Sequence, residues 1–393
     1  MEKVSSSNGI EKYPKLSFPG FAEPWTEIEI GKTFKVTRGY VLPATVVKDS
    51  VDEEYVYPVY SSQTKDNGLM GYYNDFLYEN AITWTTDGAN AGTVYYRPGR
   101  FYCTNVCGVL LSDEGKANRC VAEILGSVSK KYVSYVGNPK LMNNVMSEIR
   151  IFIPPLAEQQ KVDALLSIID LRIKKQQELI EHLKKYKRGV IKTLLSPKKN
   201  NRENVIWTTN TIGNLGTFSK GAPLSKANIS YSGTPFILYG ELYTTYKEVV
   251  RTIVRRTQAN VDNVYLSKVG DVVIPTSGET PEEISTASCV MVPNVILAGD
   301  LNIYRSDVVD GRIMSYLLNH IVNDQIARVA QGKSVVHVQA SEVKKVTITY
   351  PDHSEQERIA QILELIDKRI AMSEDALSSI QNMKRALLQQ LFI

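Results

Sequence analysis

The sequence predicts an α/β protein with two mixed α/β domains, separated by two long helices that pair as an antiparallel coiled coil. Three observations predict this arrangement. One long segment occurs twice in the chain, each copy carries a heptad pattern of apolar residues, and each copy follows a stretch of short β-rich runs. With 393 residues, of which 43% are hydrophobic and 22% charged, the chain is long enough for two domains that each bury a core.

The repeated segment predicts the two long helices. Residues 151–195 align with residues 348–392 at a constant offset of 197, and 12 of the 45 aligned positions are identical. Pro154 and Pro351 stand just before the helical pattern, where proline is tolerated. Apolar residues then recur at alternating spacings of four and three, which is the seam of a coiled coil. The seam residues are Val162, Leu166, Ile169, Ile173, Ile180, Leu183, Val190 and Leu194 in the first copy, and Ile359, Leu363, Ile366, Ile370, Leu377, Ile380, Leu387 and Leu391 in the second.

Polar residues interrupt the seam at equivalent places. Gln176 and Lys187 do so in the first copy, and Ser373 and Lys384 in the second. A polar seam residue costs stability and can fix register, so the shared positions favour one paired geometry over two unrelated helices that each pack on their own domain. The basic run 184–188 is interpreted as helix surface with one register-setting residue, the alternative being contacts with backbone phosphates.

The stretches before the helices predict the two domains. Their beginnings align at an offset of 182, with Trp25 matching Trp207 and Gly39 matching Gly221, so the second copy holds about 15 more residues in its middle. Strands are predicted at 55–60, 81–84, 92–96, 108–111, 235–238, 271–274, 288–292 and 302–304, and a helix at 313–329. The predicted parts are domain 1 (1–152), the central helix (153–196), a linker (197–203), domain 2 (204–350) and the C-terminal helix (351–393).

Composition indicates a cytoplasmic protein with reduced thiols. The chain has no apolar run of 18 residues and no hydrophobic segment near Met1, so neither a membrane span nor a secretory signal is expected. Four cysteines are too few for a disulfide framework in a chain of this size. The net charge of +4 and the pI of about 8.6 are compatible with a nucleic-acid partner without requiring one.

Patterns that imitate catalytic or metal sites are incomplete. Gly31-Lys32-Thr33 resembles the end of a P-loop, but Thr26 stands where the motif needs glycine. The chain has no Asn/Asp-Pro-Pro-aromatic loop of an adenine methyltransferase, and the Glu-x-Lys spacing at Glu342 lacks an identifiable acidic partner. Cys103 and Cys107 could begin a metal site, but no histidine has matching spacing. No catalytic or metal site and no bound cofactor are therefore expected.

In this duplicated order the chain resembles the DNA-specificity subunits of type I restriction–modification systems over nearly its whole length. The features that carry the resemblance are the two P-x(3)-EQ openings, IPPLAEQQKVDALLSIIDLRI and YPDHSEQERIAQILELIDKRI, the FPGFAEPW segment at Phe18–Trp25, GDVVIPTSGETPEE at Gly270–Glu283, and Gly332-Lys333-Ser334. The second copy departs in having Asp352-His353 where the first has Pro155-Leu156.

The resemblance implies a non-catalytic, DNA-binding subunit. Each domain would be a target recognition domain that reads one half of a bipartite, asymmetric site in double-stranded DNA, and the paired helices would set the spacing. Two modification subunits, which carry the methyltransferase chemistry and S-adenosylmethionine, would dock on this chain, and restriction subunits would join through them. The alternatives are the corresponding subunit of a type IIB-like system and a structural coiled-coil adaptor. A self-sufficient nuclease or methyltransferase is not expected.

Polar and basic residues in loops are the candidates for DNA contacts, because phosphates need Lys or Arg and base edges need Arg, Lys, amide or hydroxyl groups. In domain 1 the candidates are Thr85, Thr86, Asn90, Arg97, Arg100, Lys130, Lys131, Lys140, Asn143 and Asn144. In domain 2 they are Lys220, Arg255, Arg256, Ser277, Thr280, Gln331, Lys333, Ser334 and His337. We expect these loops to act as groups, with many single residues remaining solvated surface charges.

Overall fold

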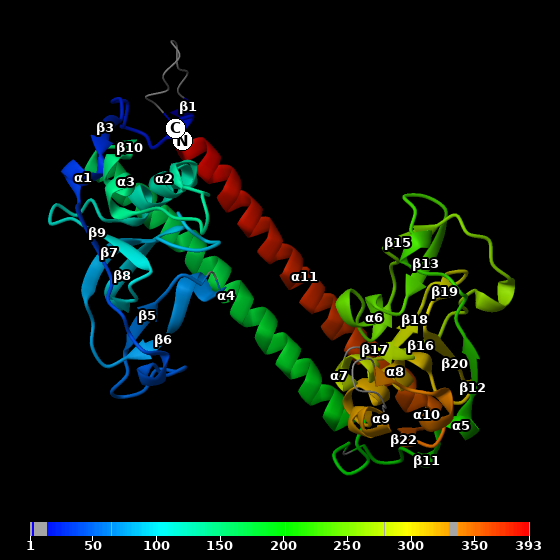
Figure 1. Ribbon diagram of the computed structural model, residues 1–393. Helices are drawn as coiled ribbons and strands as arrows, with labels where there is room; N and C mark the ends of the chain where they lie inside the picture. The colour runs from blue at the N-terminus through cyan, green and yellow to red at the C-terminus, as the bar shows by residue number, and fades with distance from the viewer. Residues whose placement is uncertain are drawn as a thin grey trace. The chain divides into compact units, whose positions relative to one another are not determined.

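The chain divides into two compact units. The computed structural model describes residues 2–3, 14–63, 65–200, 202–278, 280–329 and 336–392. Unit 1 comprises residues 1–177 and 375–393, and unit 2 comprises residues 178–374. Helix α4 (Leu156–Leu194) begins in unit 1 and ends in unit 2, whereas α11 (His353–Leu391) begins in unit 2 and ends in unit 1 (Figure 1). Each unit therefore contains one end of each long helix.

Unit 1 is built on a six-stranded mixed sheet of order β4-β9-β7-β8-β5-β6. Only the β5–β8 pair among these described strands is parallel. Helix α2 (Arg119–Ser129) packs its apolar face on this sheet, and its N-cap Asn118 accepts a hydrogen bond from the Val121 N–H at 3.1 Å. The other elements of this unit are β1 (Glu2–Lys3), β2 (Leu16–Ser17), β3 (Thr26–Glu29), α1 (Ile30–Thr33), β4 (Lys35–Arg38), β5 (Tyr57–Tyr60), β6 (Leu69–Tyr73), β7 (Tyr78–Thr85), β8 (Val94–Cys103), β9 (Cys107–Leu111), α3 (Asn143–Glu148) and β10 (Arg150–Ile153).

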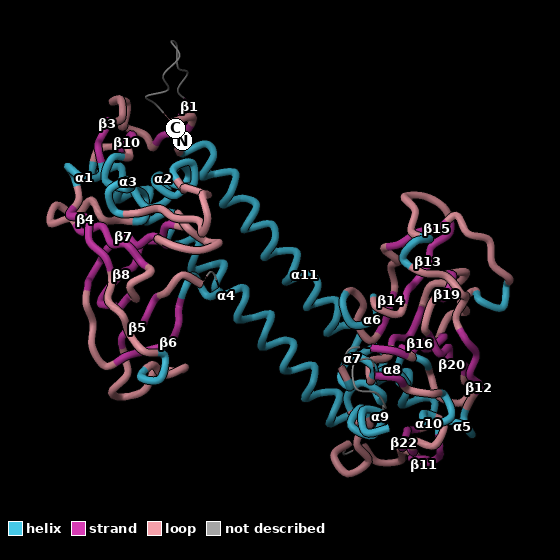
Figure 2. The backbone as a smooth tube through the Cα atoms, in the orientation of Figure 1, coloured by secondary structure: helices cyan, strands magenta, loops and turns pink. Residues whose placement is uncertain are grey.

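Unit 2 contains a five-stranded sheet of order β12-β20-β16-β18-β14 and a three-stranded sheet of order β15-β13-β19 (Figure 2). Both sheets are mixed, because β14 pairs parallel with β18 and β13 pairs parallel with β19. The elements are β11 (Trp207–Thr211), α5 (Ile212–Leu215), β12 (Thr217–Lys220), β13 (Thr234–Leu238), α6 (Glu241–Thr244), β14 (Val249–Val250), β15 (Arg255–Thr257), β16 (Asp271–Pro275), β17 (Ser277–Gly278), α7 (Pro281–Ile284), β18 (Ser288–Val290), β19 (Ile296–Ala298), β20 (Leu301–Arg305), α8 (Gly311–His320), α9 (Asn323–Val329), β21 (Val336–His337), α10 (Ala340–Val343) and β22 (Thr347–Pro351).

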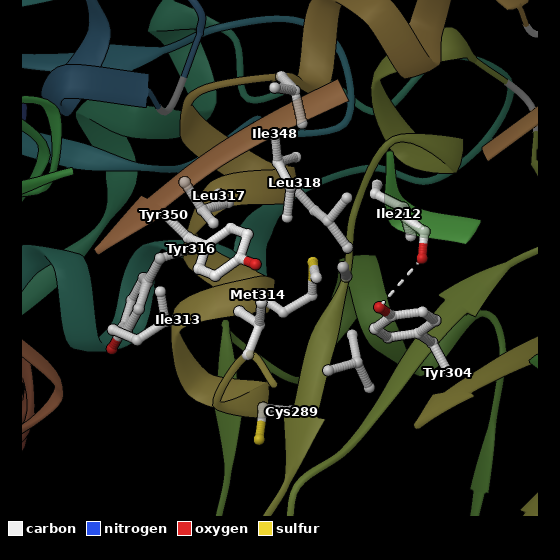
Figure 3. Packing of buried hydrophobic residues seen from close by; sticks show 14 of the residues in the cluster. Ile212, Cys289, Tyr304, Ile313, Met314, Tyr316, Leu317, Leu318, Ile348 and Tyr350 are labelled. Atoms are coloured by element: carbon white, nitrogen blue, oxygen red, sulfur yellow. Dashed lines mark hydrogen bonds between the residues drawn. The ribbon is translucent and has the colours of Figure 1, made fainter. Parts of the chain in front are cut away.

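The core of unit 2 lies between α8 and the five-stranded sheet. Met314, Leu317 and Leu318 of α8 are buried there beside Tyr304 of β20, whose hydroxyl donates a hydrogen bond to the Ile212 carbonyl at 3.2 Å (Figure 3). The hydroxyl is thereby satisfied inside an apolar cluster, as a buried tyrosine requires. This core ties the beginning of the unit to its central sheet.

Each of the eight predicted strands overlaps an observed strand, but the helix predicted over 313–329 is wrong in one respect. It is two helices, α8 and α9, with a break at Ile321 and Val322. The Val322 N–H donates to the Leu317 carbonyl at 3.0 Å, and the Val322 carbonyl accepts from the Gln325 N–H at 2.9 Å. The chain thus turns at two β-branched residues, which are weak helix formers.

The stretches that precede the two long helices begin and end in the same way. In unit 1, β3 pairs antiparallel with β10, and in unit 2, β11 pairs antiparallel with β22. The N–H of Ile30 donates to the Ile149 carbonyl at 3.0 Å, and the N–H of Ile212 donates to the Val346 carbonyl at the same distance. The offsets of 182 and 197 therefore describe one strand pair that occurs twice, directly before each long helix.

The predicted helix pair is confirmed, and it is antiparallel. In unit 1 the apolar cluster contains Val162 and Leu166 from the start of α4 together with Leu388 from the end of α11. In unit 2 it contains Ile191 from the end of α4 and Ile359 from the start of α11. All sixteen predicted seam residues are buried or half-buried. None of the described helices has a stretch that is both long and apolar enough to span a membrane.

Candidate nucleic-acid interface

Two loops of unit 1 that are far apart in the sequence lie together. The N–H of Gly88 donates to the Pro139 carbonyl and the N–H of Leu141 donates to the Thr86 carbonyl, both at 2.9 Å. Ser134 and Lys140 exchange two backbone hydrogen bonds of 2.9 Å, which close the exposed loop 134–140. The predicted segments 85–90 and 138–144 thus form one surface, which we call the loop pair (residues 85–92 and 130–144).

The loop pair is basic and largely exposed. Lys130 and Lys131 lie in the 3₁₀ turn after α2, and Lys140 closes the 134–140 loop; all three side chains are exposed. Asn144 is exposed, and the half-buried Asn143 donates through its Nδ2 to the Thr37 carbonyl at 3.3 Å. Sequence reasoning found these residues separately, but only the tertiary hydrogen bonds bring them together.

Other candidates in unit 1 are buried or engaged. The hydroxyl of Thr86 donates to the Val106 carbonyl at 3.0 Å, and Thr85 and Arg97 are also buried. Asn90 donates through its Nδ2 to the Ser62 carbonyl at 3.1 Å. Arg100 is exposed, with its Nε 3.3 Å from a Glu79 carboxylate oxygen. The exposed candidates of the loop pair are therefore Lys130, Lys131, Lys140 and Asn144, whereas Arg100 is held by Glu79 and Arg97 is buried.

In unit 2 a strand pair joins two of the predicted groups. Ser277 of β17 pairs with His337 of β21, so the segment 270–283 meets the end of the segment 331–337. Ser277 is buried and donates to an Asp300 carboxylate oxygen at 2.9 Å, whereas His337 is exposed. Thr280 is exposed and accepts the Glu283 N–H at 3.2 Å. The candidates Gln331, Lys333 and Ser334 lie outside the described residues.

The remaining candidate cations among the described residues of unit 2 lie on strands. Lys220 is exposed at the end of β12. Arg255 of β15 is exposed and pairs with Glu241, its Nε lying 2.8 Å from the carboxylate. The neighbouring Arg256 is exposed and donates to the Gly233 carbonyl at 3.0 Å. β15 thus presents two guanidinium groups, of which Arg255 is held by an acid.

The lysine that interrupts the seam in α4 is the centre of a buried ion-pair network. Lys187 Nζ lies 2.7 Å from Asp367 Oδ1 of α11 and 2.9 Å from Glu248 Oε2. Glu248 also contacts His320 Nε2 at 2.6 Å. Burial would raise the pKa of Glu248, but the hydrogen bonds and charges of His320 and Lys187 outweigh burial and lower it to about 2.

The equivalent lysine of α11 makes the corresponding contacts in unit 1. Lys384 Nζ lies 2.9 Å from Asp170 Oδ1 of α4 and 3.3 Å from Glu123 Oε1 of α2. Arg119 pairs with the same Asp170. Burial would lower the pKa of Lys384, but Glu123 and Asp170 raise it above its usual range. The sequence located both lysines, whereas their acidic partners are seen only in the structure.

The glutamine of the repeated Glu-Gln pair attaches the start of each long helix to the unit in which that helix begins. Gln159 donates through its Nε2 to the Pro154 carbonyl at 2.8 Å and accepts a hydrogen bond from Asn118 Nδ2 at 2.7 Å. Gln356 donates to the equivalent proline carbonyl at 2.9 Å and accepts from the Asp310 N–H at 2.7 Å. Asn118 and Asp310 are the N-caps of α2 and α8. The motif is therefore a structural clamp at each helix start.

The outer face of each long helix carries apolar residues at equivalent positions. Ile168 of α4 and Leu365 of α11, which the repeat aligns, are each 66% exposed. Arg172 and Arg369 follow one turn later in both helices and are exposed. The repeat therefore places an exposed apolar residue and an exposed arginine at equivalent positions of the two helices.

The four cysteines are buried and free. Burial raises the pKa of the Cys107 thiol to about 11, so it is not a thiolate at neutral pH. Within the described part of the chain, no cluster of three or more His, Cys, Asp or Glu side chains is placed to hold a metal ion.

This architecture and sequence match known specificity subunits. The model of the type I restriction modification DNA specificity domain matches residues 22–185 and again residues 204–382. The type I restriction enzyme MjaVIII specificity subunit of Methanocaldococcus jannaschii is 22% identical over 94% of this chain and 92% of its own length. The MpnII specificity subunit of Mycoplasma pneumoniae is 32% identical over 36% of this chain and 43% of its own length.

The fold agrees with these matches. The crystal structure of a type I restriction–modification S subunit from M. genitalium superposes with a TM-score of 0.64 at 16% identity, and the match covers 97% of this chain and 99% of that one. The family model accounts for both units and for most of both long helices. The chain belongs to the DNA-specificity subunits of type I restriction–modification systems, which are non-catalytic subunits.

Proposed function

We propose that each unit reads one half of a bipartite, asymmetric site in double-stranded DNA. The observation that carries the proposal is that the same strand pair and helix clamp occur in both units, whereas the sheets between them differ. Because the strand pair and the helix start are shared while the sheets differ, we expect the two units to recognise different DNA sequences. Specificity then depends on loop side chains and on DNA shape.

The exposed residues of the loop pair are the proposed contacts in unit 1. Lysines 130, 131 and 140 suit phosphates, and Asn144 can both donate to and accept from base edges. The 134–140 loop protrudes with Tyr135 69% and Val136 92% exposed, so apolar groups are available to a groove. In unit 2 we propose Lys220, Arg256, Thr280 and His337, which are exposed, together with the predicted Gln331, Lys333 and Ser334.

The paired helices are proposed to set the distance between the half-sites and to dock two methyltransferase subunits. The equivalent exposed residues Ile168 and Leu365 support one docking surface per helix, since identical partners need equivalent surfaces. S-adenosylmethionine would be bound by those subunits, and restriction subunits would join through them. The specificity chain would then supply positioning, without a reacting group of its own.

The proposal is tested by a mobility-shift assay of this chain mixed with its methyltransferase partner, using DNA that carries the motif found by methylome sequencing of the source strain. We expect sequence-selective, salt-dependent binding. We also expect binding to be lost when either half-site is scrambled or when the spacer changes by one base pair. Equal affinity for motif and scrambled DNA would contradict the proposal and favour a structural adaptor.

A further inference from the structure

Arg97 of β8 is a buried cation in unit 1. Its side chain contacts two aromatic rings, with the guanidinium carbon 3.7 Å from the centroid of Tyr60 and 4.5 Å from that of Tyr95. Its Nε donates to Thr83 Oγ1 at 3.0 Å, and the residue is only 5% exposed. Both tyrosine rings supply favourable cation–π contacts to the guanidinium.

No carboxylate in the described ranges lies within ion-pair distance of Arg97. Burial lowers the pKa of this guanidinium, which reports a desolvation cost that no acid offsets. Arg305 and Arg312 show the usual arrangement, because Arg305 donates two hydrogen bonds to the Asp271 carboxylate and Arg312 donates to the Asp310 carboxylate. Arg97 has the donors of such a pair, but none of the described residues provides an acid for them.

Arg97 lies in the wall of a cavity of about 960 Å³ in unit 1. Asn67, Tyr96 and Lys174 line the same cavity and add further donors. Of the acidic residues in the wall, Asp170 and Glu123 are engaged by Lys384, and Asp66 is the third. The cavity is therefore large enough for a ligand, and among its described lining residues the cations Arg97 and Lys174 have no ion-pair partner.

We propose that this cavity is a binding site for a phosphate group, with Arg97 as its central donor. A phosphate oxygen accepts from a guanidinium in the same fork geometry as a carboxylate, so it completes the missing half of the pair. The phosphate belongs either to the DNA backbone or to a free small molecule. The DNA source rests on the proposed function, whereas the site itself does not.

The site is tested on the full chain by thermal unfolding in inorganic phosphate and in chloride of equal ionic strength. Phosphate also stabilises proteins by exclusion from their surface, so the comparison is between variants. We expect phosphate to raise the melting temperature of the wild type by about 2–4 °C more than that of Arg97→Lys or Arg97→Met. Arg100→Lys, at an exposed arginine of the same strand that lies outside the cavity wall, should respond like the wild type.

Arg97→Lys keeps the charge and loses the planar fork, so it remains informative if Arg97→Met fails to fold. An equal phosphate response in the wild type and in Arg97→Lys overturns the site. With the methyltransferase partner present, a DNA phosphate predicts that Arg97→Lys weakens binding to all sequences by about the same factor, at least threefold. An unchanged affinity for every sequence overturns the DNA source and leaves free phosphate as the ligand, while loss of sequence selectivity alone would contradict a phosphate contact.

Discussion

The Nζ of Lys187 lies 2.7 Å from Oδ1 of Asp367, and their repeat equivalents Lys384 and Asp170 form the same pair at 2.9 Å with the helices exchanging roles. The lysine comes from α4 in unit 2 and from α11 in unit 1. One antiparallel register therefore satisfies both pairs, whereas sliding a helix by one turn would separate each buried lysine from its acid. The seam interruptions act as register determinants at these two places.

Lys187→Met is expected to destabilise unit 2 by about 3 kcal/mol, because it leaves Asp367 and Glu248 without their shared cation in a mostly buried site. Lys384→Met should cost less, about 1 kcal/mol, since its partners are more exposed. Pulsed thiol alkylation along a urea series separates the effects, because Cys289 reports on unit 2 and Cys120 on unit 1.

The matched control for these variants is Lys185→Met, at an exposed position of the same helix, which should change stability by less than about 0.5 kcal/mol. Equal labelling of Cys289 in Lys187→Met and in this control would show that the network contributes nothing to unit 2.

Unit 2 is expected to lose stability in acid through Glu248. Its pKa in the folded protein is about 2, below the ordinary value of 4.5, so its contribution is present above about pH 4.5 and is lost as the pH falls toward 2. The shift corresponds to about 3 kcal/mol. The melting temperature, followed by circular dichroism, should fall less steeply between pH 6 and pH 3 in Glu248→Gln than in the wild type. Parallel pH profiles for this variant and the wild type would exclude Glu248 as the titrating group.

Gly31 and Gly213 should not tolerate a side chain. A Cβ at Gly31 would lie 2.9 Å from the Ser147 Cβ, and one at Gly213 would lie 2.9 Å from the Lys344 Cβ. Each alanine variant is expected to lose about 1–3 kcal/mol by overpacking where α1 meets α3 or α5 meets α10.

Gly189 is the matched control for these glycines. It lies within α4, and no heavy atom comes within 4 Å of an added Cβ. Gly189→Ala should therefore stabilise the protein by about 0.5–1 kcal/mol through helix propensity. Urea unfolding compares the three variants, and a neutral Gly31→Ala would show that this contact can relax without cost.

Substituting a lysine of the loop pair should weaken the binding of all DNA sequences by about the same factor. With the methyltransferase partner present, Lys131→Ala and Lys140→Ala are each expected to reduce the slope of log affinity against log salt by about 1, because each removes one phosphate contact. Lys32→Ala, at an exposed lysine of α1 outside the loop pair, serves as the control. A changed ratio of motif to scrambled binding would instead place these lysines at base edges.

The sequence by itself determined the helix pair, because a heptad seam and its duplication are local patterns that one helix displays along its own length. It also aligned the beginnings of the two domains through Trp25 and Trp207 but predicted no strand there, and the five-part domain division stays a prediction beside the two observed units. The break at Ile321 was not visible, since the apolar pattern continues through it.

Only the tertiary structure decided which candidate side chains are buried and which are exposed. Arg97 and Lys130 were both predicted as DNA contacts, yet Arg97 is buried against tyrosine rings and Lys130 is exposed. It also decided that Lys187 finds Asp367 and that the loops at Gly88 and Pro139 join. Composition and periodicity record how a residue relates to its neighbours along the chain. Burial, ion pairs and joined loops depend on segments that are distant in sequence and meet only when the chain folds.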